Sequence, residues 1–322
     1  MKSRFYPPPS CEGWVPAGLH PGYIPLGRLT TTGTPFFIRE NTRSAMTCVT
    51  GPKDACIPLI HHLLCTEMHF QRSVLLFGAS SFFPDKIPSL FPSATEWNPC
   101  TASNPFPGET ILPSILADIL ASGINTHGEN MEQICILRGV CALIIRKIRA
   151  KGLVLDAPTF LQILDDPMTS ASILKESTKR FHTAWNQLSK ETKNILGDTL
   201  HAWRSSSSPS ENVSRWMHSG GLAFFSEDHP IHAAILLRRL LVLKSTERFT
   251  PLLFVIFLSR IDSILIAHLL QSPYVRILVW HSQSPTYSFP FHEIRHITTL
   301  RKQSVFRYIP TPSSIKGIEF ML

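Results

Sequence analysis

The chain has 322 residues, of which 43% are hydrophobic and 17% charged, and this balance excludes an intrinsically disordered protein. Seven cysteines in a chain of this length exclude a disulfide-rich secreted scaffold. No uninterrupted apolar run reaches the roughly 18 residues that mark a membrane-spanning helix. The formal net charge of +8 favours acidic partners such as nucleic acid, a membrane surface or an acidic protein, although the basic residues are scattered along the chain.

Segment 1–30 is rich in proline and glycine and predicts an extended N-terminal arm. Lys2 and Arg4 are followed by Pro7-Pro8-Pro9, where a signal peptide requires an apolar stretch. We therefore expect a cytoplasmic protein without a transmembrane segment, either free or held peripherally at the inner membrane by its partners.

The next elements predict a strand, a loop, a helix and a second strand. A β-element is expected to start at 33–37, and a strand is expected over 46–50. Residues 51–58 are expected to form a loop, followed by an apolar helix to about residue 66 and a strand over 73–78. This order implies a parallel pair of strands joined by a right-handed crossover.

The expected loop has the position of a nucleotide-binding phosphate loop, which reads G-x-x-x-x-G-K-[ST]. Gly51 takes the place of the first glycine. The second glycine, the lysine and the hydroxyl residue are replaced by Cys56, Ile57 and Pro58. Since those positions supply close backbone approach, positive charge and a magnesium ligand, the pattern predicts the shape of the loop without its chemistry.

The residues at this vestigial phosphate-binding position are Gly51, Pro52, Lys53 and Asp54. Lys53 is the one residue of the loop that would replace the missing lysine from another position.

A helical block is predicted over 112–204, including one long helix from about Ser172 to Trp203. The serine-rich segment 205–210 then marks a boundary. After it the α/β alternation returns, with strands expected at 221–225, 251–258, 275–280 and 304–309 and helices at 232–243 and 260–271. Alternating strands and helices around an excised helical block imply a parallel sheet that carries an inserted all-α domain.

Other kinds of site find little support in the sequence. Cys48, Cys56 and Cys65 are eight and nine positions apart, without the C-x-x-C spacing of a zinc site, so we interpret them as ordinary reduced thiols despite the nearby histidines. The G-x-S-x-G motif of a serine hydrolase does not occur. The pair Asp165-Asp166 precedes a proline and is interpreted as a helix end and loop.

The whole layout resembles the soluble motor part of conjugative type IV coupling proteins, in which a RecA-like P-loop NTPase domain is interrupted by an all-α domain. The segments that carry the resemblance, in chain order, are 27–40 with Gly33-Thr34 before 35–40, Val49-Thr50-Gly51, 73–80, Trp97-Asn98-Pro99, and 220–225 with the helix 231–243. The resemblance implies an arm at 1–30, a RecA-like domain in two parts (31–111 and 205–322) and an all-α insertion at 112–204.

Two further departures distinguish the chain from active members of that family. The resemblance places a magnesium-binding aspartate and a water-activating glutamate at the end of the strand 252–258, where this chain continues with Ser259-Arg260. Asp262 lies beyond that strand end. Gln283, which follows the strand 275–280, is similar to the family's polar sensor of the γ-phosphate, and is vestigial without a phosphate to sense.

We therefore expect a catalytically degenerate member of this family, with no cofactor and no metal site. Its expected role is that of an inactive structural or adaptor subunit of a type IV secretion coupling complex, acting through protein–protein interaction, with an active homologous ATPase as one candidate partner. Two alternatives remain open. One is a basic nucleic-acid-binding accessory protein of conjugative transfer, and the other is an atypical active ATPase that uses Lys53 and Asp262.

Overall fold

The computed structural model describes residues 23–39, 46–83, 87–106, 111–124, 131–204, 211–225, 230–246, 253–258, 263–283, 291–300, 303–310 and 317–322. The chain forms two compact units. Unit 1 comprises Met1–Glu96, Trp216–Glu227 and Phe249–Leu322, and unit 2 comprises Trp97–Arg215 and Asp228–Arg248. The helical block expected at 112–204 lies inside unit 2, which extends beyond it at both ends. Within the described ranges, no helix has the length and apolar character needed to cross a membrane.

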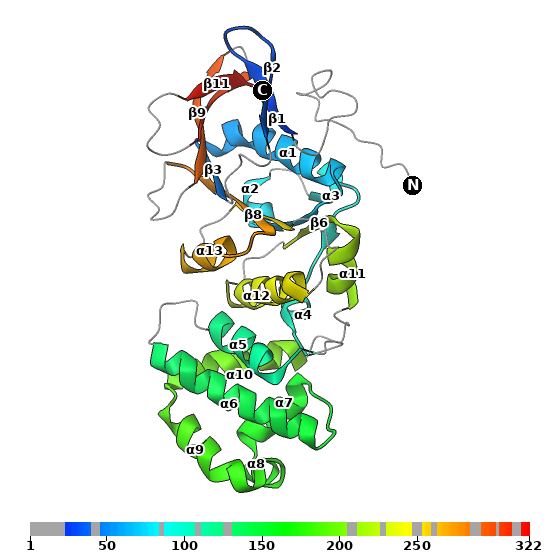
Figure 1. The fold of residues 1–322 in the computed structure, drawn as a ribbon, viewed down its shortest axis with the longest axis vertical. Helices are drawn as coiled ribbons and strands as arrows, with labels where there is room; N and C mark the ends of the chain where they lie inside the picture. The colour runs from blue at the N-terminus through cyan, green and yellow to red at the C-terminus, as the bar shows by residue number, and fades with distance from the viewer. Residues whose placement is uncertain are drawn as a thin grey trace. The chain divides into compact units, whose positions relative to one another are not determined.

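Unit 1 is built on one 11-stranded sheet with the strand order β2-β1-β11-β10-β9-β3-β8-β7-β4-β6-β5 (Figure 1). Its strands are β1 (Tyr23–Leu29), β2 (Pro35–Arg39), β3 (Met46–Thr50), β4 (Ser73–Phe77), β5 (Thr95–Glu96), β6 (Gly221–Phe224), β7 (Leu253–Phe257), β8 (Val275–His281), β9 (His292–Leu300), β10 (Gln303–Ile309) and β11 (Ile318–Met321). The strands from β9 to β5 pair in parallel, and those from β2 to β9 pair antiparallel. The predicted α/β class with a mostly parallel sheet is confirmed.

The parallel strands form because their apolar runs are buried on both faces of the sheet. Every residue of β3 and of β4 is buried. The sheet is accompanied by the helices α1 (Lys53–His69), α2 (Ala79–Phe82), α3 (Ile87–Leu90) and α13 (Ser263–Leu270). Helix α1 packs on the sheet through Leu59, Ile60, Leu63 and Leu64, which belong to the same buried core as Val49 of β3.

The arm expected at 1–30 needs correction, because Tyr23–Leu29 forms β1, while residues 1–22 lie outside the described residues. Ile24 and Leu26 are fully buried in the core against α1, which outweighs the low strand propensity of the neighbouring proline and glycine. Pro25 and Gly27 lie at a register shift in the pairing of β1 with β2, where a missing backbone N–H is tolerated.

Unit 2 is helical, with α4 (Pro99–Ser103), α5 (Pro113–Ile124), α6 (Met131–Ala150), α7 (Ala157–Asp165), α8 (Pro167–Leu174), α9 (Thr178–Gln187), α10 (Lys190–Arg204) and α12 (Pro230–Thr246); α11 (Glu211–Ser219) joins it to unit 1. The single long helix predicted from Ser172 to Trp203 is wrong. Lys175 has a positive φ of 50°, and Leu188 is extended, so the chain breaks at both places. Asp166 ends α7 and caps α8 by accepting from the N–H of Thr169, so the expected helix end is present, but α8 begins at Pro167 without the expected loop.

His62 of α1 makes the stability of unit 1 depend on pH. Its side chain is fully buried, and its Nε2 atom lies 2.9 Å from the carbonyl oxygen of Pro25. Burial lowers the pKa of His62 from 6.5 to about 4, so the folded state holds the neutral imidazole. The unfolded chain therefore binds the proton first, and the stabilising contribution is complete above pH 6.5 and lost as the pH falls towards about 4.

We expect acidification from about pH 7 to about pH 4 to cost about 3 kcal/mol of unfolding free energy through this one residue. Urea unfolding at several pH values measures the slope. The variant His62→Gln is expected to show a correspondingly smaller loss on acidification, whereas His182→Gln, the same change at an exposed position of α9, should leave the slope unchanged. Equal slopes in His62→Gln and the natural protein would contradict this assignment.

Candidate functional site

The connection between β3 and α1 contains the predicted vestigial phosphate-binding position. Only Gly51 and Pro52 lie between the two elements, because α1 begins at Lys53 and includes Asp54. The fixed φ of Pro52, −55°, is compatible with a helix start, so the helix begins earlier than expected. A phosphate loop needs a longer run of backbone N–H groups that curve around the phosphate. A connection of two residues, one of them proline, has no such run.

The polar backbone groups of Gly51 are bonded to β8. Its N–H donates to the carbonyl oxygen of His281 at 3.0 Å, and its carbonyl oxygen accepts from the indole Nε1 of Trp280 at 3.2 Å. In a working loop, backbone N–H groups point at the phosphate. Here the first of them is used to hold the end of β3 against β8.

The space beside Gly51 is filled by side chains of its own unit. Gly51 has a φ of +144°, and a Cβ atom built on it would lie 2.5 Å from the Cβ of His296 and 3.3 Å from the Sγ of Cys56. The first distance is shorter than the contacts that real Cβ atoms make, and the second is tighter than most of them. The close approach that glycine allows is therefore used by His296 of β9, which explains why a glycine is needed here without any bound phosphate.

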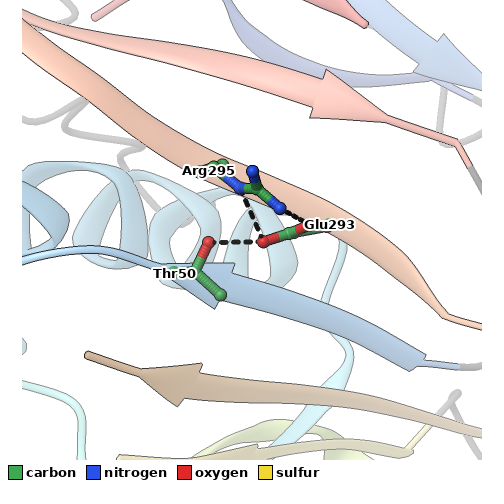
Figure 2. Close-up of polar contacts among 3 residues, drawn as sticks. All are labelled: Thr50, Glu293 and Arg295. Atoms are coloured by element: carbon green, nitrogen blue, oxygen red, sulfur yellow. Dashed lines mark hydrogen bonds and ion pairs between the residues drawn. The ribbon is translucent and has the colours of Figure 1, made fainter. Parts of the chain in front are cut away.

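A buried carboxylate lies next to this connection, between β3 and β9 (Figure 2). The Oγ1 of Thr50 donates to Oε1 of Glu293 at 2.8 Å, and Arg295 donates from Nε and Nη2 to the two carboxylate oxygens at 3.0 and 2.8 Å. Glu293 is only 6% exposed, so the bidentate pair neutralises a charge that has little contact with water. An engaged, neutralised carboxylate is poorly suited to activate water. This cluster is not predicted above from the sequence, where its signal is the spacing Glu293-x-Arg295, which puts both side chains on one face of a strand.

The family resemblance places a magnesium ligand at the end of the strand 252–258. In the structure, stacked aromatic rings lie at this edge of the sheet. Phe77 ends β4, Phe257 ends β7 and Phe225 directly follows β6. The ring of Phe77 lies between the other two, with centroid distances of 5.0 Å to Phe225 and 5.2 Å to Phe257 and interplanar angles of 20° and 15°. All three rings are buried. We call these three residues the aromatic stack.

Magnesium takes oxygen ligands in near-octahedral geometry, and the aromatic stack offers none. Over the described ranges, no group of three or more His, Cys, Asp or Glu side chains has the geometry of a metal site. Asp262, Ser259 and Arg260 lie outside the described residues. Gln283 is exposed, two residues beyond the end of β8.

Two imidazoles and two thiols near Gly51, those of His281, His296, Cys56 and Cys48, are held in their neutral forms. Burial lowers the pKa of His281 and of His296, so both imidazoles are largely uncharged at neutral pH. Burial raises the pKa of Cys56 to about 12, and burial together with the charge of Glu293 raises the pKa of Cys48. These groups therefore supply neither the positive charge that a triphosphate requires nor a reactive thiolate.

The segment Trp97-Asn98-Pro99 opens the helical unit with a helix cap. The Oδ1 of Asn98 accepts from the N–H groups of Cys100 at 2.9 Å and Thr101 at 3.3 Å, and Pro99 occupies the first helical position of α4. This helix cap explains why Asn98 and Pro99 occur at the start of α4, independently of any ligand.

Comparisons with known proteins give structural matches only. No protein-family model matches the sequence, and no curated protein sequence matches it at a significant level. The unbound bacterial conjugative coupling protein TrwBdeltaN70 superposes with a TM-score of 0.53 at 12% identity, over 79% of this chain and 66% of that chain. The plasmid coupling protein TrwB in complex with ADP and Mg2+ superposes with a TM-score of 0.51 at 12% identity, over 79% of this chain and 67% of that chain.

A looser match is VirB4 of Thermoanaerobacter pseudethanolicus, with a TM-score of 0.42 at 12% identity, over 83% of this chain and 78% of that chain. The chain spans about two thirds of the length of the coupling-protein structures. At this level of identity the likeness concerns the fold. The chain therefore has the fold of the conjugative coupling protein TrwB, a mostly parallel sheet with flanking helices.

Proposed function

We propose that this chain is a nucleotide-free structural or adaptor subunit of a type IV secretion coupling complex. The observation that carries the proposal is the conflict between its fold and its site. The fold matches a coupling protein whose structure was solved with ADP and Mg2+, whereas in this chain the two-residue β3–α1 connection and the aromatic stack lie at the carboxyl ends of the parallel strands.

Phosphoryl transfer depends on positioning the phosphates and on neutralising the charge that develops on them. The described residues at the edge of the sheet offer a shortened connection, neutral imidazoles and stacked rings in place of that apparatus. What such a chain retains is the shape of a coupling-protein subunit. A subunit with this shape acts by contact, either with an active homologous ATPase or with other proteins of the secretion complex, including those at the inner membrane.

The proposal is tested by assembly. A tagged copy of the full chain, expressed at its natural level in its native host and cross-linked before lysis, is expected to co-purify with a component of a secretion complex. The complex should persist when nucleotide is removed enzymatically, because its formation does not use nucleotide. Recovery of the chain with no secretion component, or loss of the complex on nucleotide removal, would contradict the proposal.

The atypical-ATPase alternative requires Lys53 to contact phosphate. Lys53 stands in the first turn of α1, after Pro52, instead of within a loop. Turnover of radiolabelled ATP by the full chain and by Lys53→Ala separates the two functions. We expect no turnover above a heat-inactivated sample in either protein, and activity that disappears in Lys53→Ala would favour the alternative.

A second candidate function, nucleic-acid binding, is favoured by helix α9. This helix exposes Lys179, Arg180 and His182 and contains no acidic residue. Binding through such a face would weaken steeply with salt, because phosphate contacts release counterions. The double variant Lys179→Ala with Arg180→Ala should then reduce the salt dependence, whereas Arg204→Ala, at an exposed arginine on α10, should change it less. Undetectable binding to single- and double-stranded DNA at low salt removes this candidate.

A further inference from the structure

A thiol and an imidazole face each other inside unit 2. The Sγ atom of Cys100, on α4, lies 3.6 Å from Nε2 of His232, on α12. His232 is 9% exposed, whereas Cys100 is only half-buried and so can be reached from solvent. A nucleophile within hydrogen-bond reach of a base, with the base oriented by a third group, is the arrangement of nucleophilic catalysis.

Ser103 is the third group, and its hydrogen bonds determine which imidazole nitrogen carries the proton. The Oγ of Ser103 lies 2.8 Å from Nδ1 of His232, 3.1 Å from the carbonyl oxygen of Cys100 and 3.0 Å from the indole Nε1 of Trp203. The indole can only donate and the carbonyl can only accept. All three bonds form together when Ser103 donates to the carbonyl and accepts from both Trp203 and Nδ1. The proton of neutral His232 is then on Nδ1, and Nε2 is the acceptor that faces Cys100.

The surroundings of Cys100 and His232 do not suit acyl transfer, and they hold the two side chains in place. The N–H groups of Cys100 and Thr101 both donate to Asn98, so they do not form an oxyanion hole for acyl transfer. Arg239, fully buried, donates to the carbonyl oxygens of Ala102 and Asn104 and holds the end of α4 in place. Thiol–disulfide exchange needs no oxyanion hole, only a thiol, an acceptor for its proton and access.

We propose that Cys100 is a modification site that reacts with low-molecular-weight disulfides, with His232 as the base. The proton of Sγ passes to Nε2 of His232 while Sγ attacks one sulfur of the disulfide. The S–S bond of the reagent breaks, a new S–S bond joins that sulfur to Cys100, and the departing thiolate takes the proton from His232. The products are a mixed disulfide on Cys100 and one free thiol. This inference does not depend on the proposed function.

The consequence for unit 2 is local. The mixed disulfide removes the Cys100–His232 contact and places a bulky group between α4 and α12, which pack against each other. Oxidation of the thiol pool would thus loosen the start of α4 from α12, and reduction would restore the contact.

Burial raises the pKa of Cys100, so its resting thiol keeps its proton and needs a base to react. With His232 as the base, the rate of reaction follows the fraction of neutral imidazole and becomes flat with pH once the imidazole has lost its proton. Without a base, the rate follows the thiolate and rises about tenfold for each pH unit below the pKa of the thiol. A merely structural hydrogen bond would leave the pH profile unchanged when His232 is replaced.

The experiment uses the full reduced chain, oxidised glutathione as the probe, and peptide mass spectrometry to follow each cysteine. Cys135, an exposed thiol on α6, serves as the reference within the same molecule. We expect Cys100 to react faster than Cys135 at neutral pH. The variant His232→Gln should lower the Cys100 rate at least tenfold, since general bases contribute about 10²-fold or more, and should leave Cys135 unaffected.

His232→Gln should also convert the flat pH profile of Cys100 into a rising one, whereas the conservative variant Ser103→Thr, which keeps the hydroxyl, should retain the flat profile. Thermal melts of both variants establish that they are folded. The proposal is overturned if Cys100 reacts no faster than Cys135, or if folded His232→Gln keeps both the rate and the flat pH profile.

Discussion

Replacing Arg239 by leucine is expected to lower the free energy of unfolding by about 4 kcal/mol, through the loss of donors to two buried carbonyl groups. Arg239 is 0% exposed, and its Nη1 donates to Ala102 at 2.9 Å and to Asn104 at 3.0 Å. Each carbonyl left without a donor costs about 1–3 kcal/mol. Leucine keeps the helix propensity of α12 and fills part of the space, so the loss reports the hydrogen bonds more than the packing.

The matched control is Arg238→Leu, the same change at the neighbouring, half-buried position of the same helix. Urea unfolding monitored by tryptophan fluorescence measures both variants, since Trp203 lies in the core of unit 2. We expect Arg238→Leu to cost clearly less than Arg239→Leu. Comparable losses in the two variants would mean that the buried hydrogen bonds of Arg239 do not stabilise α4.

Replacing Gly220 by alanine is expected to cost about 3 kcal/mol or more, because a left-handed backbone and a backbone clash act together. Gly220 has a φ of +73°, and a Cβ atom there would lie 2.2 Å from the carbonyl oxygen of Gln71. Gln71 has a positive φ of its own, 55°, and Arg72 beside it pairs with buried Glu67 at 2.6 Å. The clash thus involves backbone that is fixed on both sides, and a small side-chain movement does not relieve it.

Gly33→Ala separates the two causes. Gly33 has nearly the same φ, +69°, but no atom lies within 4 Å of the position that a Cβ atom would take there. It should therefore cost only the conformational term, about 1 kcal/mol. Thermal and urea unfolding of both variants give the difference, which reports the clash at Gln71. A Gly220→Ala variant as stable as Gly33→Ala would show that the β4 and β6 strand starts are not fixed as described.

The strands that the sequence predicted most directly are β3 and β4, whose apolar runs are buried on both faces. The strands β1, β9 and β11 were missed for a physical reason. Strand β9, His292–Leu300, is buried at 292–294 and mostly exposed at 295–299, and it contains His, Glu and Arg, so its composition is typical of a loop. Such a strand is stable only because β3 and β10 flank it in the sheet.

The sequence predicts the special backbone position of Gly51 but not the residues that surround it. In particular, it does not show that the side chain of His296, 245 positions later, fills the space beside Gly51. The aromatic stack depends in the same way on register, since Phe77 is paired with Phe257 only once β4 and β7 are aligned. The phosphate-loop pattern placed the helix start after residue 58, whereas α1 begins at Lys53 and contains Pro58, although a proline inside a helix is disfavoured.

The most direct test of the central claim is the thermal stability of the full chain with magnesium-ATP and with magnesium-ADP. A ligand present at about 100 times its Kd stabilises the folded state by about 2.7 kcal/mol, which raises the melting temperature measurably. We predict no rise at millimolar nucleotide, with or without magnesium, and identical melts for the natural chain and Lys53→Ala. A magnesium-dependent rise that Lys53→Ala abolishes would contradict the account and establish a nucleotide site at the start of α1.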